Sequence, residues 1–351
     1  MKKYINLILF ACLAMSFCSC NAGDRKTIRG MYIMEDRITG PEEVSPENLE
    51  GYDFFYLVMT PVWKAGDFDA PGDGAAEGFM SGRTELVRSF ISTAHACGAK
   101  VLLCLQGEDF VNIASNAVRR RNFTDVATGF IEGYGFDGID LDWEQTVTKE
   151  LHLDMMRELR RGLDGMGGRR YLTTALNCGH EYTADEAAAL SEVADWINIM
   201  YYDMGGGFWG TSAGHNAPLN AIKENYDSLW RVFDASKLHI GLASYGYAYH
   251  DLKPGEKVPE GKTLADYMLP FWNAPADWTE EWDGEAQVPY YYSPDGKSFM
   301  TVENARSLEA KAEWIKEIGA GGFFWWEFHC DRDGTTGKHA LSDAFADNFN
   351  R

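Results

Sequence analysis

Short apolar segments alternate with amphipathic segments along most of the chain, from residue 30 to its end. The apolar segments have the length and composition of strands, and most segments between them have the periodicity of helices. We expect eight strands, over residues 30–34, 54–59, 101–105, 138–141, 171–176, 197–202, 239–244 and 322–326. Repeated strand–helix units predict an α/β fold, a (β/α)8 barrel (TIM barrel) whose functional side chains lie at the C-terminal ends of the strands.

Two of the expected helices have recognisable ends. The amphipathic segment 84–97 is followed by Gly98, and glycine is a common residue just after a helix. The segment 185–193 follows Thr183, whose hydroxyl can accept from the first free backbone N–H groups of a helix. We therefore expect helices at both places.

The repeating pattern breaks after the seventh strand. More than fifty residues rich in aromatic and turn residues precede the helix that begins near Ala305. Because structureless loops of that length are uncommon in compact domains, we expect residues 248–302 to form a small α+β insertion. It would lie between strand 7 and helix 7, over the barrel mouth, within a domain that spans residues 27–351.

Three acidic residues, Asp140, Asp142 and Glu144, alternate with large apolar residues in the fourth expected strand and just beyond it. Successive side chains of a strand point to opposite faces, so the three carboxyls would project the same way. Burial and mutual repulsion disfavour three charges together, and at least one carboxyl should hold a proton near neutral pH. A protonated carboxyl beside an ionised one suits general acid catalysis on a glycosidic oxygen, and we expect Glu144 to be the donor.

An acidic edge strand facing solvent and a metal cage are alternative interpretations of this pattern. The residues that alternate with the acids, Ile139, Leu141 and Trp143, need burial of their own. They favour a strand that is covered by helices on one side and faces a barrel lumen on the other. No calcium-loop sequence accompanies the acids, so we expect no metal and no cofactor.

The composition narrows the class of ligand. Aromatic residues make up 14% of the 351-residue chain, which suits a surface that stacks on flat partners such as sugar rings. The net charge of -21 argues against nucleic acid or an anionic membrane as a partner, whereas a neutral polymer is indifferent to it. We expect a monomer. Most cysteines in a barrel of this size should be buried free thiols, and the mature chain contains Cys97, Cys104, Cys178 and Cys330.

The N-terminus resembles an export signal. Residues 1–3 (MKK) precede an apolar run, 5–17, that is too short for a stable membrane span. The run ends in FCSCN, residues 17–21, which resembles a bacterial lipoprotein processing site. We expect residues 1–19 to be a signal peptide and Cys20 to carry lipid that anchors the protein to a bacterial membrane, in the periplasm or at the cell surface. Cleavage beyond Ala22, with secretion, is the alternative.

Residues 137–144, DGIDLDWE, resemble the D-x-x-D-x-D-x-E signature of family 18 glycoside hydrolases. Segments on other expected strands resemble further motifs of that family: GMY at 30–32, MYYD at 200–203 and GGFFWW at 321–326. The loop at 208–219 and the insertion at 282–293 look like those of chitinases. The resemblance supports the barrel fold and covers nearly the whole mature chain.

The resemblance implies roles for particular residues. Glu144 would donate the proton, Asp142 would orient the acetamido group of the substrate, and Asp140 would share a proton with Asp142. Tyr202 would donate a hydrogen bond to the acetamido oxygen, and Asp203 would contact the reacting sugar and Glu144. The expected substrate-binding residues are Tyr32, Met200, Trp209, Tyr247 and Trp326, the last as the hydrophobic floor beneath the sugar.

Some residues depart from the family pattern or lie outside the expected site. Residues 104–107 are CLQG where the family usually has S-x-G-G, so Cys104 replaces a better hydrogen-bond donor to the first Asp of the acidic row. Tyr247 stands where many chitinases have Arg, so a subsite contact is absent or replaced. Asp137 is out of register with the acids and His215 lies in a loop, so we expect structural roles for both.

The expected reaction follows from the placement of the acids. Asp142 and Glu144 share one strand face, so Asp142 is badly placed to attack the anomeric carbon from the side opposite the acid. The resemblance implies that the acetamido oxygen of the substrate is the nucleophile. We expect retaining hydrolysis of β-1,4 bonds after N-acetylglucosamine (GlcNAc) in chitin or chitooligosaccharides. An endo-β-N-acetylglucosaminidase acting on the N-glycan chitobiose core, a non-catalytic carbohydrate-binding barrel and an unrelated barrel enzyme are the alternatives.

Overall fold

The structure is a computed structural model that describes residues 27–59, 64–70, 83–107, 109–144, 147–205, 212–259, 265–270, 275–333 and 336–349. The expected signal peptide, Cys20 and Trp209 lie outside these ranges. Within the ranges, no helix combines the length and the apolar character needed to cross a membrane.

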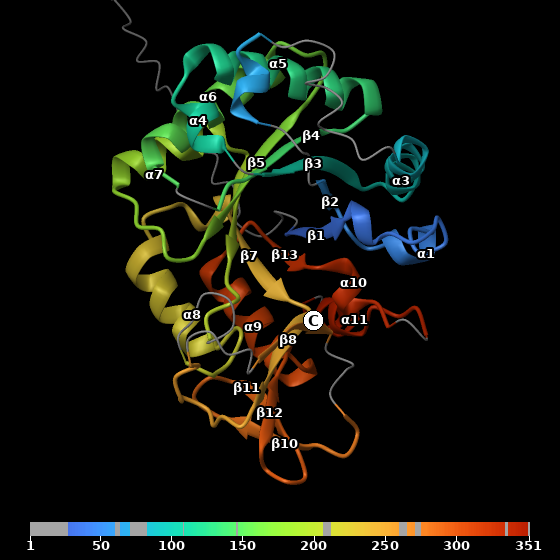
Figure 1. Cartoon of the computed structure of the whole chain (residues 1–351), viewed down its shortest axis with the longest axis vertical. Helices are drawn as coiled ribbons and strands as arrows, with labels where there is room; N and C mark the ends of the chain where they lie inside the picture. The colour runs from blue at the N-terminus through green and yellow to red at the C-terminus, as the bar shows by residue number, and fades with distance from the viewer. Residues whose placement is uncertain are drawn as a thin grey trace, which may run out of the picture.

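Eight parallel strands close into a barrel in the order β1-β13-β7-β6-β5-β4-β3-β2 (Figure 1). Their bounds are β1 Ile28–Met34, β2 Phe54–Met59, β3 Lys100–Gln106, β4 Gly138–Asp142, β5 Tyr171–Asn177, β6 Trp196–Met200, β7 Leu238–Ala243 and β13 Gly322–Trp326. The expected (β/α)8 barrel is confirmed. Strand β6 ends at Met200, before the expected Tyr202, because the N–H of Tyr201 bonds back to the carbonyl of Ile199 (3.0 Å).

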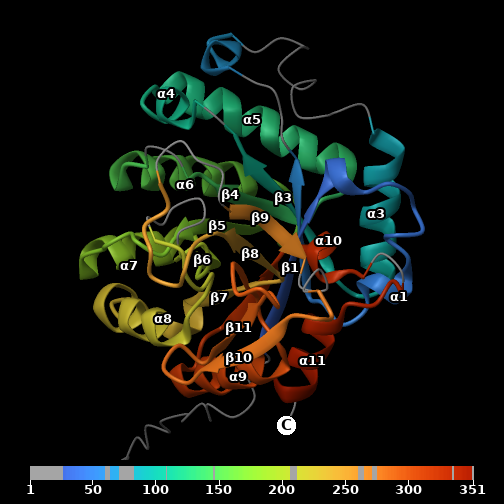
Figure 2. The same cartoon turned by 60° about the horizontal axis from the view of Figure 1, so that its bottom comes forward.

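Helices surround the barrel on its outer side (Figure 2). They are α1 Pro46–Leu49, α3 Thr84–Ala96, α4 Phe110–Ala114, α5 Ala117–Tyr134, α6 Lys149–Asp164, α7 Ala184–Val193, α8 Leu219–Asn225, α9 Ala305–Ile318, α10 Phe328–Asp331 and α11 Ala340–Phe349. Both helix predictions from end signals are confirmed. Gly98 follows α3 with φ +83°, and Thr183 caps α7 by accepting from the N–H of Glu186 (3.3 Å).

A second, antiparallel sheet in the order β10-β11-β12-β8-β9 occupies the expected insertion. Its strands are β8 Tyr245–His250, β9 Ala265–Pro270, β10 Thr279–Asp283, β11 Val288–Tyr292 and β12 Ser298–Thr301. We expected an insertion of α+β type, whereas the described residues of this segment form strands and turns. Gly246 is required where β8 crosses β12, because a Cβ there would lie 1.7 Å from the carbonyl oxygen of Thr301.

The outer face of β4 explains the apolar residues that alternate with the acids. Ile139 and Leu141 are fully buried, and Trp143 is nearly so. The Trp143 ring lies 5.5 Å from that of Phe110 in α4 and 6.2 Å from that of His152 in α6, centroid to centroid. These contacts place the apolar face of β4 against the helices, so the acidic face points into the barrel.

Candidate active site

The acidic row begins deep in the barrel and ends near its mouth. Asp140 is fully buried, Asp142 is 3% exposed and Glu144, two residues beyond the end of β4, is partly exposed. Gly138 begins the strand where β4 and β5 approach closely, since a Cβ there would lie 2.0 Å from the carbonyl oxygen of Tyr171. Because successive acids rise toward the C-terminal end of the strand, a ligand at the barrel mouth meets Glu144 first.

Side chains on three other strands, β1, β5 and β6, donate hydrogen bonds to Asp140. Tyr32 donates to its Oδ2 (2.8 Å), and Thr173, in register on β5, donates to its Oδ1. Asn198 Nδ2 lies 3.4 Å from the same Oδ1. Burial raises the pKa of Asp140 to about 6, and these hydrogen bonds oppose the rise.

A chain of hydrogen bonds crosses the barrel interior below the acids. Trp196 Nε1 donates to the Tyr56 hydroxyl (2.9 Å), which donates to Asn198 Oδ1 (3.4 Å). Asn198 Nδ2 in turn lies 2.8 Å from the Tyr32 hydroxyl, which donates to Asp140. The rings of Tyr32 and Tyr56 are stacked, with centroids 4.3 Å apart. This chain fixes the orientation of Asp140 from the side opposite the barrel mouth.

Asp142 has one engaged and one free carboxyl oxygen. Its Oδ2 accepts from Gln106 Nε2 (3.2 Å) and lies 4.0 Å from the Cys104 thiol. Its Oδ1 is buried and has no hydrogen-bond partner among the described residues. Burial raises the pKa of Asp142 well above its ordinary value, and the charges of Glu144 and Asp140 raise it further. An unpaired buried acceptor costs about 1–3 kcal/mol, and a ligand that donates to Oδ1 would offset this cost.

Glu144 combines partial burial with access to a ligand. Its Oε1 accepts from Gln106 Nε2 (3.1 Å). Burial raises the pKa of Glu144, the bond from Gln106 opposes the rise, and the nearby charge of Asp203 adds to it. A raised pKa keeps a carboxyl protonated closer to neutral pH, as a general acid requires.

Asp203 is placed by a left-handed turn directly after β6. Its φ is 60°, and its backbone N–H donates to Asn216 Oδ1 (2.7 Å). Its Oδ1 accepts from Tyr245 (2.5 Å) and from Tyr247, both on β8. Burial raises the pKa of Asp203, and the two phenol bonds oppose this. The sheet of the insertion thus holds an acid that acts electrostatically on Glu144.

Aromatic residues on β1 and β13 and just after β6 form one wall of the site. Trp326, at the end of β13, is partly exposed, and its ring lies 5.6 Å from that of Tyr32. Phe324 links them to Tyr202, with ring centroids 5.2 Å from Tyr32 and 6.3 Å from Tyr202. Met200 ends β6 with 9% of its surface exposed. Tyr32 and Tyr247 are fully buried and use their hydroxyls on Asp140 and Asp203, and Trp326 lies against Tyr32.

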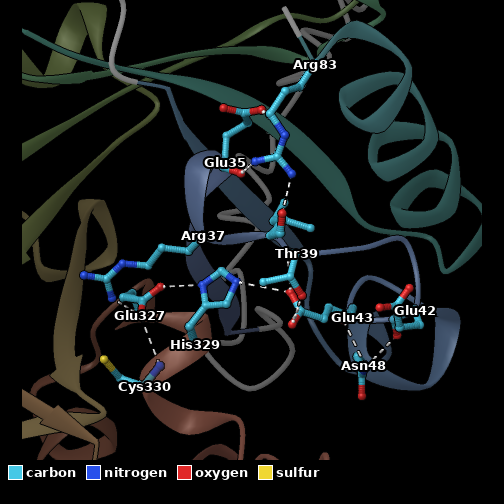
Figure 3. A network of polar contacts seen from close by, with 11 residues as sticks. Glu35, Arg37, Thr39, Glu42, Glu43, Asn48, Arg83, Glu327, His329 and Cys330 are labelled. Atoms are coloured by element: carbon cyan, nitrogen blue, oxygen red, sulfur yellow. Dashed lines mark hydrogen bonds and ion pairs between the residues drawn. The ribbon is translucent and has the colours of Figure 1, made fainter. Parts of the chain in front are cut away.

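A polar network surrounds Glu327, the residue after Trp326 (Figure 3). Glu327, joined to Trp326 by a cis peptide bond, is fully buried. Its carboxylate accepts from Arg37 Nη1 (3.1 Å) and the Cys330 N–H (3.0 Å), and lies 3.1 Å from His329 Nδ1. Burial raises the pKa of Glu327, but the bonds to its neighbours outweigh it and lower the pKa overall. Glu327 thus holds the turn after β13 as a charged, fully engaged group.

Asp137 lies apart from the acidic row. It accepts from Lys100 Nζ (3.0 Å) and the Val101 N–H (2.9 Å), and lies 2.7 Å from His95 Nε2. Burial raises the pKa of Asp137, but these bonds outweigh it and lower the pKa overall. The arrangement agrees with the structural role expected for this residue.

His215 joins its loop to the insertion. Its Nε2 lies 3.2 Å from Asp283 Oδ2 and its Nδ1 lies 3.3 Å from Thr301 Oγ1. Its ring stacks on Tyr290 at 3.7 Å between centroids. Burial lowers the pKa of His215 to about 4, so the ring is neutral at physiological pH. These contacts agree with the expected loop-ordering role.

Sequence reasoning missed Gln106, Thr173 and Tyr245 as members of this site. Gln106 and Thr173 lie opposite Asp142 and Asp140 in the strand register. The two-residue alternation of β3 also puts Gln106 on the same face as Cys104, and that signal was present in the sequence. Tyr245 had no comparable signal, because its contact with Asp203 depends on where β8 leaves the barrel.

Comparison with curated proteins finds chitinases. Chitinase A1 of Niallia circulans is 30% identical over 282 residues, which cover 67% of this chain and 40% of that protein. Chitinase 1 of Aphanocladium album is 28% identical over 266 residues, covering 67% of this chain and 63% of that protein. The chain thus spans between 40% and 63% of the length of these two relatives.

Comparison with solved structures finds the same fold. A family 18 N-acetylglucosaminidase from Paenibacillus barengoltzii superimposes with a TM-score of 0.73 at 22% identity, covering 92% of this chain and 100% of that one. A Cycas revoluta chitinase in complex with (GlcNAc)3 gives 0.75 at 19% identity, with the same coverage. At the level of sequence, the family model described as glycosyl hydrolases family 18 matches residues 70–331. With its complete acidic row inside a (β/α)8 barrel, the chain belongs to glycosyl hydrolase family 18.

Proposed function

We propose that this protein hydrolyses β-1,4 bonds after GlcNAc in chitin or chitooligosaccharides, with retention of configuration and with the substrate's own acetamido group as nucleophile. The observation that carries the proposal is the pair Asp142 and Glu144. Asp142 keeps a buried carboxyl oxygen that has no partner in the described part of the chain, and Glu144 beside it has a raised pKa and is partly exposed. One residue can receive an N–H while the other delivers a proton.

In the first step, the acetamido carbonyl oxygen attacks the anomeric carbon as the glycosidic C–O bond breaks. The leaving oxygen takes the proton of Glu144, and the sugar becomes an oxazolinium ion. Asp142 Oδ1 accepts the acetamido N–H and stabilises the positive charge. A protein nucleophile would need a carboxylate about 5–5.5 Å from the acid and on the other side of the sugar. Asp142 lies on the same strand face as Glu144 and does not meet that requirement.

In the second step, water attacks the anomeric carbon, and Glu144, now ionised, takes a proton from it. The oxazolinium ring opens to restore the acetamido group, and two inversions give net retention. Tyr202 would donate to the acetamido oxygen, and Trp326 would form the floor beneath the sugar. Asp140, held by its three donors, would share a proton with Asp142 when the latter turns toward the substrate.

The substrate class is supported by the relatives. The curated proteins matched are named as chitinases, and the Cycas revoluta chitinase was solved with (GlcNAc)3. A second candidate is cleavage of the chitobiose core of N-glycans, because the same acidic row would act on the GlcNAc residue there. The neighbour from Paenibacillus barengoltzii is called an N-acetylglucosaminidase, a name that does not say which GlcNAc linkage it cleaves. Both functions place GlcNAc at the cleaved residue.

One product profile tests these proposals. The purified protein is incubated between pH 4 and pH 8 with chitotetraose, chitohexaose and a high-mannose glycoprotein, and the first-formed anomer is read by proton NMR. The chitinase proposal expects shortened oligosaccharides with the β-anomer first. Release of glycan without action on chitohexaose would favour the second candidate. Intact oligosaccharides and intact glycoprotein would refute both.

We also propose that Cys20 is lipidated after removal of residues 1–19, from the sequence of that segment. Expression in a bacterium fed an alkyne fatty acid should label the wild-type protein and place it in the membrane fraction. The Cys20→Ser variant should lose the label. A labelled Cys20→Ser variant, or an unlabelled wild type recovered from the medium, would point to ordinary secretion.

A further inference from the structure

Gln106 ends β3 directly opposite Asp142 in the register of β3 and β4. Its single amide nitrogen lies 3.2 Å from Asp142 Oδ2 and 3.1 Å from Glu144 Oε1. A primary amide has two N–H groups, so this one nitrogen can donate to both carboxyls at once. The opposite amide orientation would turn the carbonyl oxygen toward two acceptors, which is electrostatically unfavourable.

The bridge divides the four carboxyl oxygens of the pair into two classes. Asp142 Oδ2 and Glu144 Oε1 are occupied as acceptors. Among the described residues Asp142 Oδ1 has no hydrogen-bond partner, and the Gln106 amide bonds to Glu144 through Oε1. A proton on Glu144 is therefore favoured on Oε2, because a proton on Oε1 would meet the N–H of Gln106.

We propose that Gln106 is a positioning residue that keeps Asp142 Oδ1 open for the acetamido N–H and reserves Glu144 Oε2 for the transferred proton. The inference rests on the proposed function, since it assigns atoms to the steps of that reaction. Without the amide, Asp142 and Glu144 could share a proton with one another. The shared proton and the carboxyl oxygen that accepts it would then bond to each other, and neither would be available to the substrate.

The two carboxyls that the Gln106 amide bonds to have several other titratable neighbours. Asp142 faces Asp140 on its own strand, Cys104 on β3 and Tyr32 on β1, and Glu144 faces Asp203 after β6. Burial raises the pKa of Cys104 and of Tyr32, so both groups stay protonated and uncharged beside the acids.

Against these neighbours, Gln106 lowers the pKa of both Asp142 and Glu144. Loss of its two donors should therefore raise both pKa values.

The main test replaces Gln106 with Met, which has similar length and no donor, and with Asn, which can reach one carboxyl. Chitotetraose is compared with dinitrophenyl chitobioside, whose leaving group departs without a proton. We expect Gln106→Met to lower kcat/KM about 10–100-fold on chitotetraose and less on the aryl substrate. The alkaline limb of the pH profile should move up by about one unit, because the charged form of Glu144 loses a hydrogen bond. Gln106→Asn should restore part of the loss.

Val118→Ala is the matched control, because Val118 is 56% exposed on α5 and lies outside the site. It should leave both rates and the pH profile unchanged. An equal loss on both substrates in Gln106→Met, with an unmoved alkaline limb, would overturn the positioning role.

A second measurement does not depend on activity. The protein is labelled at the Glu carboxyl carbons with ¹³C, Glu144 is assigned by its absence in Glu144→Gln, and its titration is followed by NMR. The midpoint should be higher in Gln106→Met than in wild type, and an equal midpoint would overturn the inference. A wild type that cleaves neither substrate would instead refute the proposed function, while the titration still decides whether Gln106 controls the proton of Glu144.

Discussion

Asp137, the residue before β4, and Asp142, the last residue of β4, have opposite electrostatic environments. Asp137 meets a lysine, a histidine and a backbone N–H, and its pKa is lowered despite partial burial. Asp142 meets two other acids and one amide, and its pKa is raised. The same kind of side chain is thus held as an anion outside the acidic row, whereas its ionisation is disfavoured within the row. Burial raises the pKa of both carboxyls, but the donors around Asp137 reverse that rise, whereas the acids around Asp142 add to it.

The largest effect should come from removing the proton donor at the end of the row. Glu144→Gln keeps the shape of the side chain and loses its acid, so turnover of chitotetraose should fall by at least about three orders of magnitude. Binding of the oligosaccharide, measured by calorimetry, should be retained. Loss of binding together with activity would show that Glu144 is needed for the shape of the site instead.

Asp142→Asn should have the next largest effect. The amide can still accept a hydrogen bond but no longer carries the negative charge that stabilises an oxazolinium ion, so kcat should fall about 100-fold. Single-turnover kinetics with chitotetraose measure this step directly. If kcat stays within twofold of wild type, the substrate-assisted mechanism loses its electrostatic partner and the role assigned to Asp142 is wrong.

Asp137→Asn should change stability and leave catalysis alone. The variant loses the charge that faces Lys100 and His95, which should lower the free energy of unfolding by about 1–3 kcal/mol. Because folding lowers the pKa of Asp137, its contribution is present above the ordinary value of 3.8 and is lost as pH falls through the folded pKa. Urea unfolding at pH 7 measures the loss. A large drop in kcat/KM would place Asp137 in the site after all.

The last expected effect, similar in size to that of Asp137→Asn, is on the pH dependence of stability. Folding raises the pKa of Asp140 from 3.8 to about 6, so the folded state binds more protons in this window. The contribution of Asp140 to the free energy of unfolding should therefore fall as pH rises from about 4 to about 6, by about 1 kcal/mol per pH unit. Asp140→Asn should flatten the curve measured by urea unfolding between pH 4 and pH 7. An unchanged slope would mean that Asp140 does not titrate there.

Much of the site was predictable because it lies on regular strands. The two-residue alternation of β4 placed Asp140, Asp142 and Glu144 together on the inner face, and the structure agrees. The predicted ends of the sixth and eighth strands were near enough to the observed ends of β6 and β13 to place Tyr202 and Trp326 in the same region. Local periodicity is sufficient here, since a strand sets the direction of each side chain by itself.

The electrostatics depended on contacts across strands. The fourth apolar segment, its three acids and its place within a parallel barrel follow from the order of residues alone, because side-chain alternation and burial are local requirements. Only the closed barrel decided that Gln106 would bridge Asp142 and Glu144, and only the second sheet decided that Tyr245 would hold Asp203. Strand register and loop paths bring together residues that are distant along the chain, and those distances set which carboxyl keeps its proton.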